Sequence, residues 1–211
     1  MTLRSIMKKI VRIAFLGLLL VASDAFAQLP AKIKCYRAPA ILADSAITLE
    51  DNSVVYDPSY RQIPYPNGDV PKNVGVCTDV VVRAFRKAFG WDLQKSVHDF
   101  RKAKKLPTNT SIDHRRVKNL MAYFDEVKQL RDDKGGKYRK GNIVIWNLGN
   151  GQLHIGILVE DDVIIHNICC GQQVEAMYMQ DKVIRNYTWR CPELEGLSRK
   201  EIIERYKAGK L

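Results

Sequence analysis

The chain has 211 residues, of which 46% are hydrophobic and 27% are charged, and its formal net charge is +11. This length is enough for one domain with a sizeable core, and the composition excludes a disordered or fibrous protein. No recognised nucleic-acid-binding motif accompanies the positive charge, so nucleic acid is not expected as a partner.

Residues 1–27 have the pattern of a secretory signal peptide. Four basic residues precede an apolar run at 13–22, and Ala25 and Ala27 form a small-residue cleavage site. The apolar run is too short for a membrane-spanning helix, which needs about 20 residues. We therefore predict cleavage after Ala27, export from the cytoplasm, and no stable membrane insertion afterwards. The alternatives are an uncleaved anchor and a buried first helix.

Loss of the leader removes four basic residues and Asp24, which leaves 28–211 with a net charge of +8. Much of that charge lies in three segments, at 101–105, 115–116 and 131–140. A basic protein in a cell envelope favours anionic wall polymers or lipid head groups. We interpret this charge as a solvated face that aids association with the wall, and we expect a monomer that needs no cofactor.

The first half of the mature chain is predicted to be helical around one long loop. Apolar residues at helical spacing predict three helices, at 78–89, 93–105 and 111–124. Gly90 provides a stop for the first of these. Segment 38–49 also favours a short helix, although 47–49 could instead open a strand. Prolines and glycines at 56–76 predict a loop.

The second half is predicted to form strands. Apolar residues separated by turn signals indicate strands at 142–148, 154–159, 163–166 and about 182–187. A basic loop at 131–141 precedes them, and Ser198 with Glu201 forms a capping box before a terminal helix at 199–207. Helices followed by an antiparallel sheet predict an α+β fold in one domain, 28–211, with its core at about 40–190.

Five cysteines in an oxidising compartment leave one unpaired. Cys77 begins the first predicted helix after the long loop, where free N–H groups and the helix dipole favour a thiolate. We therefore predict that Cys77 is the free, reactive cysteine. The other four are disulfide candidates: Cys35, Cys169, Cys170 and Cys191. A bond between adjacent cysteines would be a strained ring, so each of the adjacent pair is expected to bridge Cys35 or Cys191.

A nucleophilic thiol needs an imidazole as its base. Of the four histidines, His154 and His166 stand on adjacent strands of one hairpin. The other two, His98 and His114, fall in helical segments where a structural or solvated role is expected. A turn with an odd number of residues would place His166 opposite His154, and a two-residue turn would place Asn167 there instead. Either side chain would fix the tautomer of the base.

Three features follow one another along the chain: a cysteine at a helix start, a histidine within His-x-Gly-Ile at 154–157, and a second histidine 12 residues after the first. This order resembles the NlpC-type, papain-like cell-wall hydrolases. Further segments, over about 40–190, resemble a bacterial family known as domain of unknown function 1287. They are Tyr56-Asp57-Pro58, Ile63-Pro64-Tyr65-Pro66, Gly68-Asp69-Val70-Pro71, Gly75-Val76-Cys77-Thr78-Asp79, Ile112-Asp113-His114-Arg115-Arg116-Val117, Asn119-Leu120-Met121, Gly141-Asn142-Ile143-Val144 and Ile165-His166-Asn167.

The resemblance implies a papain-like fold, with N-terminal helices packed on an antiparallel sheet. It implies peptidoglycan or its fragments as the partner, in a bacterial periplasm, and cleavage of an amide in the stem peptides by an endopeptidase or an amidase. Cys77 would be the nucleophile, His154 the base and His166 the orienting residue, with Tyr56 lining the site.

The chain departs from the NlpC pattern around the nucleophile. The loop at 56–76 is longer, and Val76-Cys77-Thr78-Asp79 replaces the common Asp-Cys-Ser-Gly, so the substrate geometry is expected to differ. The backbone N–H at Thr78 is expected to help hold the oxyanion. Asp79 is expected to cap the helix or bind a loop, because a carboxylate pointing at the thiol would raise its pKa.

Asp79, Arg115 and Arg116 are the candidate substrate-binding residues. A guanidinium group pairs with a carboxylate through two parallel hydrogen bonds, so the arginines could meet a substrate carboxylate. They could equally form an exposed basic helix start.

Other interpretations stay open. Cys77 could be a small buried core residue. His154, His166 and one of the adjacent cysteines could bind zinc, but their spacing matches no compact zinc motif, so no metal is expected. The fold could also serve as a cell-wall-binding module without turnover. Hydrolysis and acyl transfer would share the same thioester, so the sequence does not choose between them.

Overall fold

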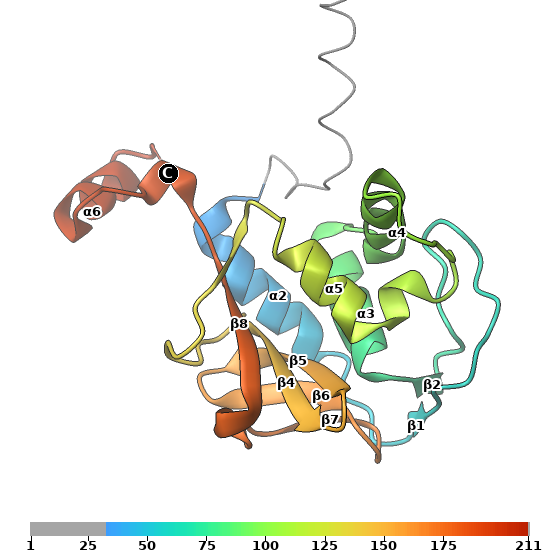
Figure 1. Cartoon of the computed structure of the whole chain (residues 1–211). Helices are drawn as coiled ribbons and strands as arrows, with labels where there is room; N and C mark the ends of the chain where they lie inside the picture. Colours follow the sequence, from blue (N-terminus) through green and yellow to red (C-terminus); the bar gives the residue numbers. More distant parts are fainter. Residues whose placement is uncertain (1–32, 211) are drawn as a thin grey trace, which may run out of the picture.

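The structure, a computed structural model, describes residues 33–210. The predicted leader at 1–27 lies outside these residues. Within them, no helix is long and apolar enough to cross a membrane. The described chain is α+β, with helices packed on one large antiparallel sheet (Figure 1), as the order of predicted elements indicated.

Helices occupy most of the first half of the described chain. Those before the large sheet are η1 Cys35–Arg37, α2 Ala38–Ile47, α3 Cys77–Phe89, α4 Leu93–Ala103, η2 Asp113–Arg115 and α5 Val117–Phe124. Three more come late in the chain: η3 Gln180–Lys182, η4 Pro192–Leu194 and α6 Arg199–Lys207. The strand alternative at 47–49 is wrong, since α2 continues to Ile47 and a turn follows. The predicted helix at 111–124 is two pieces, because Arg116 between them has extended backbone (φ −111°, ψ 117°).

The sheet has six strands in the order β3-β8-β4-β5-β6-β7, and all neighbouring pairs are antiparallel. Its strands are β3 Leu130–Asp132, β4 Ile143–Gly149, β5 Gln152–Glu160, β6 Val163–Asn167, β7 Gln172–Ala176 and β8 Val183–Trp189. A separate two-stranded parallel ladder joins β1 Val55–Tyr56 to β2 Val74–Gly75 at the two ends of the long loop. The short strands β1, β2, β3 and β7 were not predicted.

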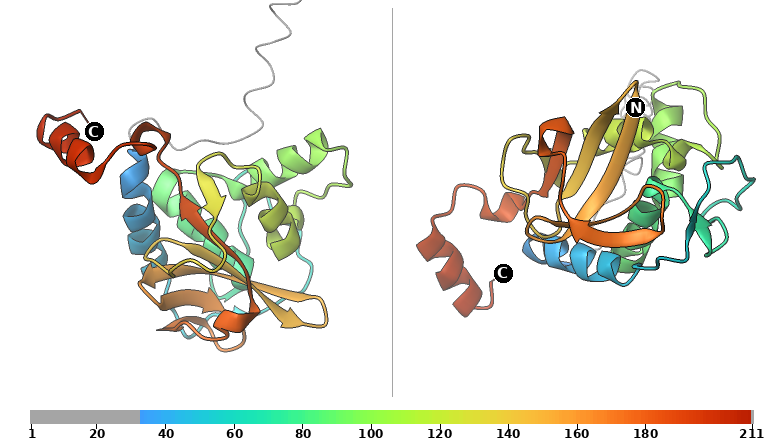
Figure 2. Two further views of the ribbon diagram at one scale, coloured as in Figure 1. Left: turned by 60° about the vertical axis from the view of Figure 1, so that its left-hand side comes forward. Right: turned by 90° about the horizontal axis from the view of Figure 1, so that it is seen from below.

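The two faces of the sheet carry different clusters. Helices α2 and α3 pack side by side against one face (Figures 1 and 2), where they meet Ile145, Ile155 and Ile157 of the central strands. Successive side chains of a strand point to opposite faces. Trp146 and His154, which pair across β4 and β5, therefore point to the other face, and Trp146 belongs to a smaller buried cluster there.

The disulfide pairing differs from the expected one. The bonds are Cys35–Cys191 and Cys169–Cys170. The expected pairing is wrong because α2 separates the two places: Cys35 precedes this helix, whereas Gly171 packs against Asn52 beyond its end. A helix of 10 residues spans about 15 Å, whereas bonded cysteines need Cα atoms within about 7 Å of each other.

Candidate active site

Cys77 is the first residue of α3 and carries the free thiol among the five cysteines. It is buried, with 5% of its surface exposed. On the helix side, the N–H of Val76 donates to Asp79 at 2.7 Å. On the sheet side, the amide of Asn167 donates to the carbonyl of Gly75 at 3.4 Å. Cys77 is thus fixed between the helix that it begins and the end of β6.

Asp79 caps the start of α3 and enters a buried ion pair. Its carboxylate accepts hydrogen bonds from Arg115 at 3.0 to 3.3 Å, and both side chains are 3% exposed. The guanidinium also donates to the carbonyls of Asp57 and Ser59. This pair therefore ties α3 to the long loop. The guanidinium of Arg115 was a candidate for substrate binding, but its hydrogen bonds go to other groups of the protein.

A cavity of about 600 Å³ opens beside Cys77. Cys77 and His154 both line it, together with Tyr56 from β1. Arg116 and Lys118 add two exposed cations to its wall. No ion pair within residues 33–210 involves either of them, which leaves both charges available to a ligand.

The thiol reaches this cavity at the edge of β5. Pairing between β5 and β6 ends at Ile157 and Ile165, and the backbone N–H of Ile155 makes a hydrogen bond to the Cys77 sulfur. The start of α3 therefore meets β5 where its partner strand has separated. This gap explains how a thiol on the helix side and His154 on the opposite face line one cavity.

His154 and His166 form a buried hydrogen-bonded pair, with Nε2 of His154 2.6 Å from Nδ1 of His166. Neither expected register is right, since Ile157 pairs with Ile165. That register places His166 two positions along from His154 on the same face, where diagonal neighbours are within reach. The structure thus brings His166, and not Asn167, to the proposed base.

Glu175 on β7 extends this pair. Its Oε1 makes a hydrogen bond with Nε2 of His166, so three polar side chains follow one another from the cavity outwards. Sequence reasoning missed Glu175 because Gln172–Ala176 contains one β-branched residue and was not predicted to be a strand. The signal that could have found it is Gly171, which marks a turn soon after β6.

Trp146 and Tyr178 enclose the two imidazoles. The ring of Trp146 lies 5.4 Å from that of His154 and 6.2 Å from that of His166, measured between centroids. Tyr178 lies 5.8 Å from His166, and its carbonyl accepts the indole N–H at 3.1 Å. These aromatic rings keep the pair buried, whereas the side chain of Glu175 at its outer end is 41% exposed.

Burial keeps the thiol and both imidazoles neutral in the resting protein. It raises the pKa of Cys77 to about 12, although the N–H of Ile155 acts in the opposite direction. Burial and the neighbouring His166 lower the pKa of His154 to about 3, and burial also lowers the pKa of His166. The direction for Cys77 is opposite to the thiolate expected at a helix start, because loss of water outweighs the helix N–H groups.

Residues 43–189 match the family described as "Domain of unknown function (DUF1287)". The chain belongs to this family. A relative from Escherichia coli (strain K12), "Uncharacterized protein YijF", is 36% identical over 165 residues, which cover 70% of this chain and 80% of the relative. The family expected from the sequence motifs is thereby confirmed. The matched segment contains Cys77, His154, His166 and Glu175.

In this DUF1287 protein, His98 and His114 lie outside the cavity wall. His98 is hydrogen-bonded to Asp113 at 3.1 Å. His114 is 2% exposed, and burial lowers its pKa to about 4. Its Nδ1 has no hydrogen-bond partner among the described residues. Both therefore belong to the packing of α4 and η2.

Thr78 and Asn167 support the start of α3 with different groups. Thr78 is fully buried, and its hydroxyl has no hydrogen-bond partner in the described part of the chain. Its backbone N–H acts on the sulfur of Cys77 and lowers the thiol pKa, the position expected of an oxyanion donor. The side-chain amide of Asn167 donates to the carbonyl of Gly75, whereas the hydrogen bond to His154 comes from His166.

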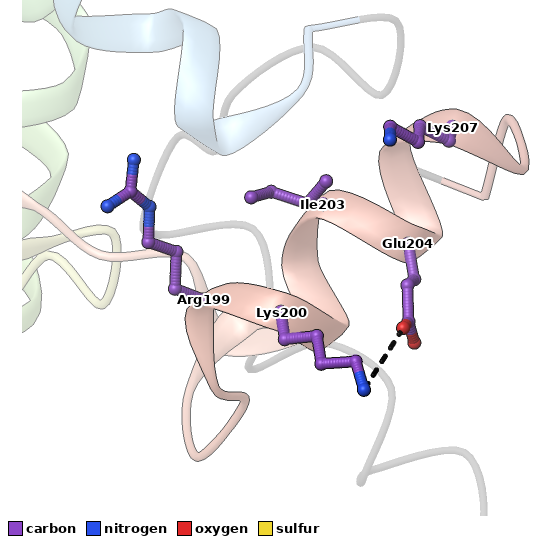
Figure 3. A pocket seen from close by; sticks show the side chains of 5 residues that line it. All are labelled: Arg199, Lys200, Ile203, Glu204 and Lys207. Carbon is purple, nitrogen blue, oxygen red and sulfur yellow. Dashed lines mark ion pairs between the residues drawn. The ribbon is translucent and has the colours of Figure 1, made fainter.

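No group of three His, Cys, Asp or Glu side chains between residues 33 and 210 is arranged to hold a metal ion. The adjacent cysteines considered for zinc are bonded to each other. A second hollow runs along α6, which has no buried residue (Figure 3). Its wall offers an ion pair between Lys200 and Glu204 at 4.0 Å but neither a nucleophile nor an imidazole.

Proposed function

We propose that this protein is a secreted, thiol-dependent amide hydrolase with a papain-like fold of the NlpC type. The observation that carries the proposal is the cavity shared by Cys77 and His154, with His154 held by His166. A free cysteine at a helix start and an imidazole oriented by a third residue are the parts that covalent catalysis of acyl transfer needs.

The resting thiol is neutral, so its proton leaves as attack proceeds. The sulfur of Cys77 bonds to the substrate carbonyl carbon while its proton moves to His154, and N–H groups at the start of α3 stabilise the oxyanion. The imidazolium then donates that proton to the leaving amine as the C–N bond breaks. Water gives a proton to His154 and attacks the thioester, and the thiol recovers its proton when the carboxylic acid leaves.

The proposed substrates are peptidoglycan stem peptides. Arg116 and Lys118 present exposed positive charge at the cavity that holds the thiol, which suits an amide with a carboxylate nearby. Arg115 is not proposed to bind substrate, because its guanidinium already donates to Asp79 and to two loop carbonyls and so ties α3 to the loop.

The proposed place of action is the bacterial periplasm. The leader pattern at 1–27 directs export. The disulfide between Cys35 and Cys191 suits an oxidising compartment. The positive charge of the mature chain suits an anionic wall.

The test is incubation of the mature, disulfide-bonded protein with purified muropeptides, followed by mass spectrometry. Wild type is expected to release shorter peptides, whereas Cys77→Ala and His154→Ala are expected to release none above the level without protein. His98→Ala is the matched control, because this histidine lies outside the cavity, and it should cut as wild type does. Ligated products instead of hydrolysed ones would identify acyl transfer through the same thioester.

A second candidate is a wall-binding module that keeps the fold without turnover. The raised pKa of the buried Cys77 thiol favours it. In that case wild type and Cys77→Ala would leave every muropeptide uncut and would bind purified sacculi equally. That pair of results would overturn the hydrolase proposal.

A further inference from the structure

Glu175 lies outside the cavity wall and acts on the candidate centre only through His166. It stands on β7 opposite Ile164 and diagonal to His166, and its carboxylate holds Nε2 of that histidine. The cavity is lined by Cys77 and His154 but not by Glu175. A substrate bound there would contact the thiol and the first imidazole, so any influence of Glu175 must pass along the histidine pair.

His154, His166 and Glu175 form a hydrogen-bonded row, and the carboxylate at its outer end determines which ring nitrogens donate and which accept. An ionised carboxylate only accepts hydrogen bonds, so Nε2 of His166 must carry a proton. In neutral imidazole the other nitrogen is then a lone-pair acceptor, so Nδ1 of His166 accepts from Nε2–H of His154. His154 must therefore keep its own lone pair on Nδ1, the nitrogen left for the proton of Cys77.

We propose that Glu175 is a positioning residue that fixes both His154 and His166 as Nε2–H tautomers and thereby leaves Nδ1 of His154 unprotonated. This inference deepens the proposed function, because an unprotonated Nδ1 is what a base for the thiol requires. It rests on the direction of two hydrogen bonds and does not depend on which amide is cut.

The opposite arrangement would disable the base. If His166 carried protons on both nitrogens, it would donate to Nε2 of His154, whose own proton would then sit on Nδ1. The lowered pKa values of both histidines oppose this state near neutral pH. The titratable groups facing the pair are Glu175 on β7, Tyr178 after it and the Cys77 thiol in the shared cavity, and β4 contributes the uncharged Trp146.

Glu175 also provides charge compensation during proton transfer. When Nδ1 of His154 takes the thiol proton, the pair gains one positive charge inside an aromatic enclosure. The carboxylate of Glu175 is the nearest negative group along the row, and an opposite charge within hydrogen-bond distance favours the charged form of an imidazole.

The test is nitrogen-15 NMR of the imidazole rings in wild type, Glu175→Gln and the control Glu204→Gln at pH 7.5, because ring nitrogen shifts report the tautomer directly. In wild type and in the control, His154 and His166 are expected to be neutral Nε2–H tautomers. Glutamine can donate as well as accept, so in Glu175→Gln His166 is expected to be a mixture of both tautomers. Unfolding by urea confirms that each variant is folded.

An Nδ1–H tautomer of His154 in wild type, or unchanged tautomers in Glu175→Gln, would overturn the inference. Cleavage of muropeptides by Glu175→Gln is expected to be slower by roughly 10-fold to 100-fold, the cost found when a metal-binding histidine loses its outer hydrogen-bond partner. If wild type cuts nothing, the hydrolase proposal fails, while the tautomers still decide the role of Glu175.

Discussion

Two carboxylates lie on opposite sides of the candidate centre, and they differ in burial and in partner. Asp79 is 3% exposed and pairs with the equally buried guanidinium of Arg115. Glu175 is 41% exposed and pairs with the imidazole of His166. A charge taken fully out of water depends on its partner for stability, whereas one that keeps contact with water does not. The difference in burial therefore gives the two carboxylates different roles. Asp79 fixes the backbone, whereas Glu175 can respond when a proton moves to His154.

The largest effect is expected where the buried pair is broken. Asp79→Asn keeps an acceptor for the N–H of Val76 but leaves the charge of Arg115 uncompensated. We expect the free energy of unfolding to fall by about 3–5 kcal/mol. The measurement is urea unfolding at pH 7, followed by circular dichroism.

The matched control for this change is Glu126→Gln. It removes the ion pair with Lys104, in which both side chains are 48% exposed. Exposed ion pairs contribute about 0–1 kcal/mol, so the free energy of unfolding should fall much less than in Asp79→Asn. Equal decreases in the two variants would show that burial does not determine how much each ion pair stabilises the fold.

A smaller effect is expected at a buried group whose charge changes with pH. Burial lowers the pKa of His114 to about 4 in the folded protein, against about 6.5 when unfolded. Below about pH 6.5 the unfolded chain therefore binds a proton that the folded protein does not, and stability falls as the pH falls. Between pH 7 and pH 5 this histidine should contribute a loss of about 2 kcal/mol.

His114→Gln removes that titration. Urea unfolding at pH 7 and at pH 5 should therefore give a smaller difference between the two stabilities for the variant than for wild type. The absolute stability at pH 7 is not the test, because glutamine also changes the packing. The buried His154 and His166 have lowered pKa values too, so a part of the difference should remain in the variant. An unchanged difference would mean that His114 does not contribute to the loss of stability at low pH.

The smallest effect on stability is expected at Glu175. In Glu175→Gln an acceptor for Nε2 of His166 remains, and the side chain keeps its contact with water, so the free energy of unfolding should change by about 1 kcal/mol or less. The same urea titration at pH 7 measures it. A loss as large as that of Asp79→Asn would show that Glu175 is a structural charge as well.

Features governed by neighbouring residues were predictable from the sequence. Apolar spacing and the stop at Gly90, which adopts a positive φ of 66°, located α3. Turn signals located the hairpin of β5 and β6, and the spacing of His154 and His166 placed two imidazoles on it. These signals depend on short stretches of chain, so a single sequence contains them.

Features that depend on distant contacts were not predictable. The register of β5 and β6 changes between Leu158 and Glu160, and such a bulge leaves no clear local signal. Strand β7, and with it Glu175, forms by pairing with β6 although its own residues favour strands weakly. The pKa of Cys77 depends on how completely the surrounding chain excludes water. The helix position of this residue alone predicted the opposite shift.

The bond between Cys35 and Cys191 encloses residues 36–190 in one covalent ring. Every strand of the sheet and the whole candidate centre lie inside that ring, while α6 lies outside it. Tension applied between the two ends of the described chain would pass from sulfur to sulfur and would bypass the sheet. A protein tethered by its ends to a stretched polymer would thus bear mechanical load without distorting the cavity beside Cys77.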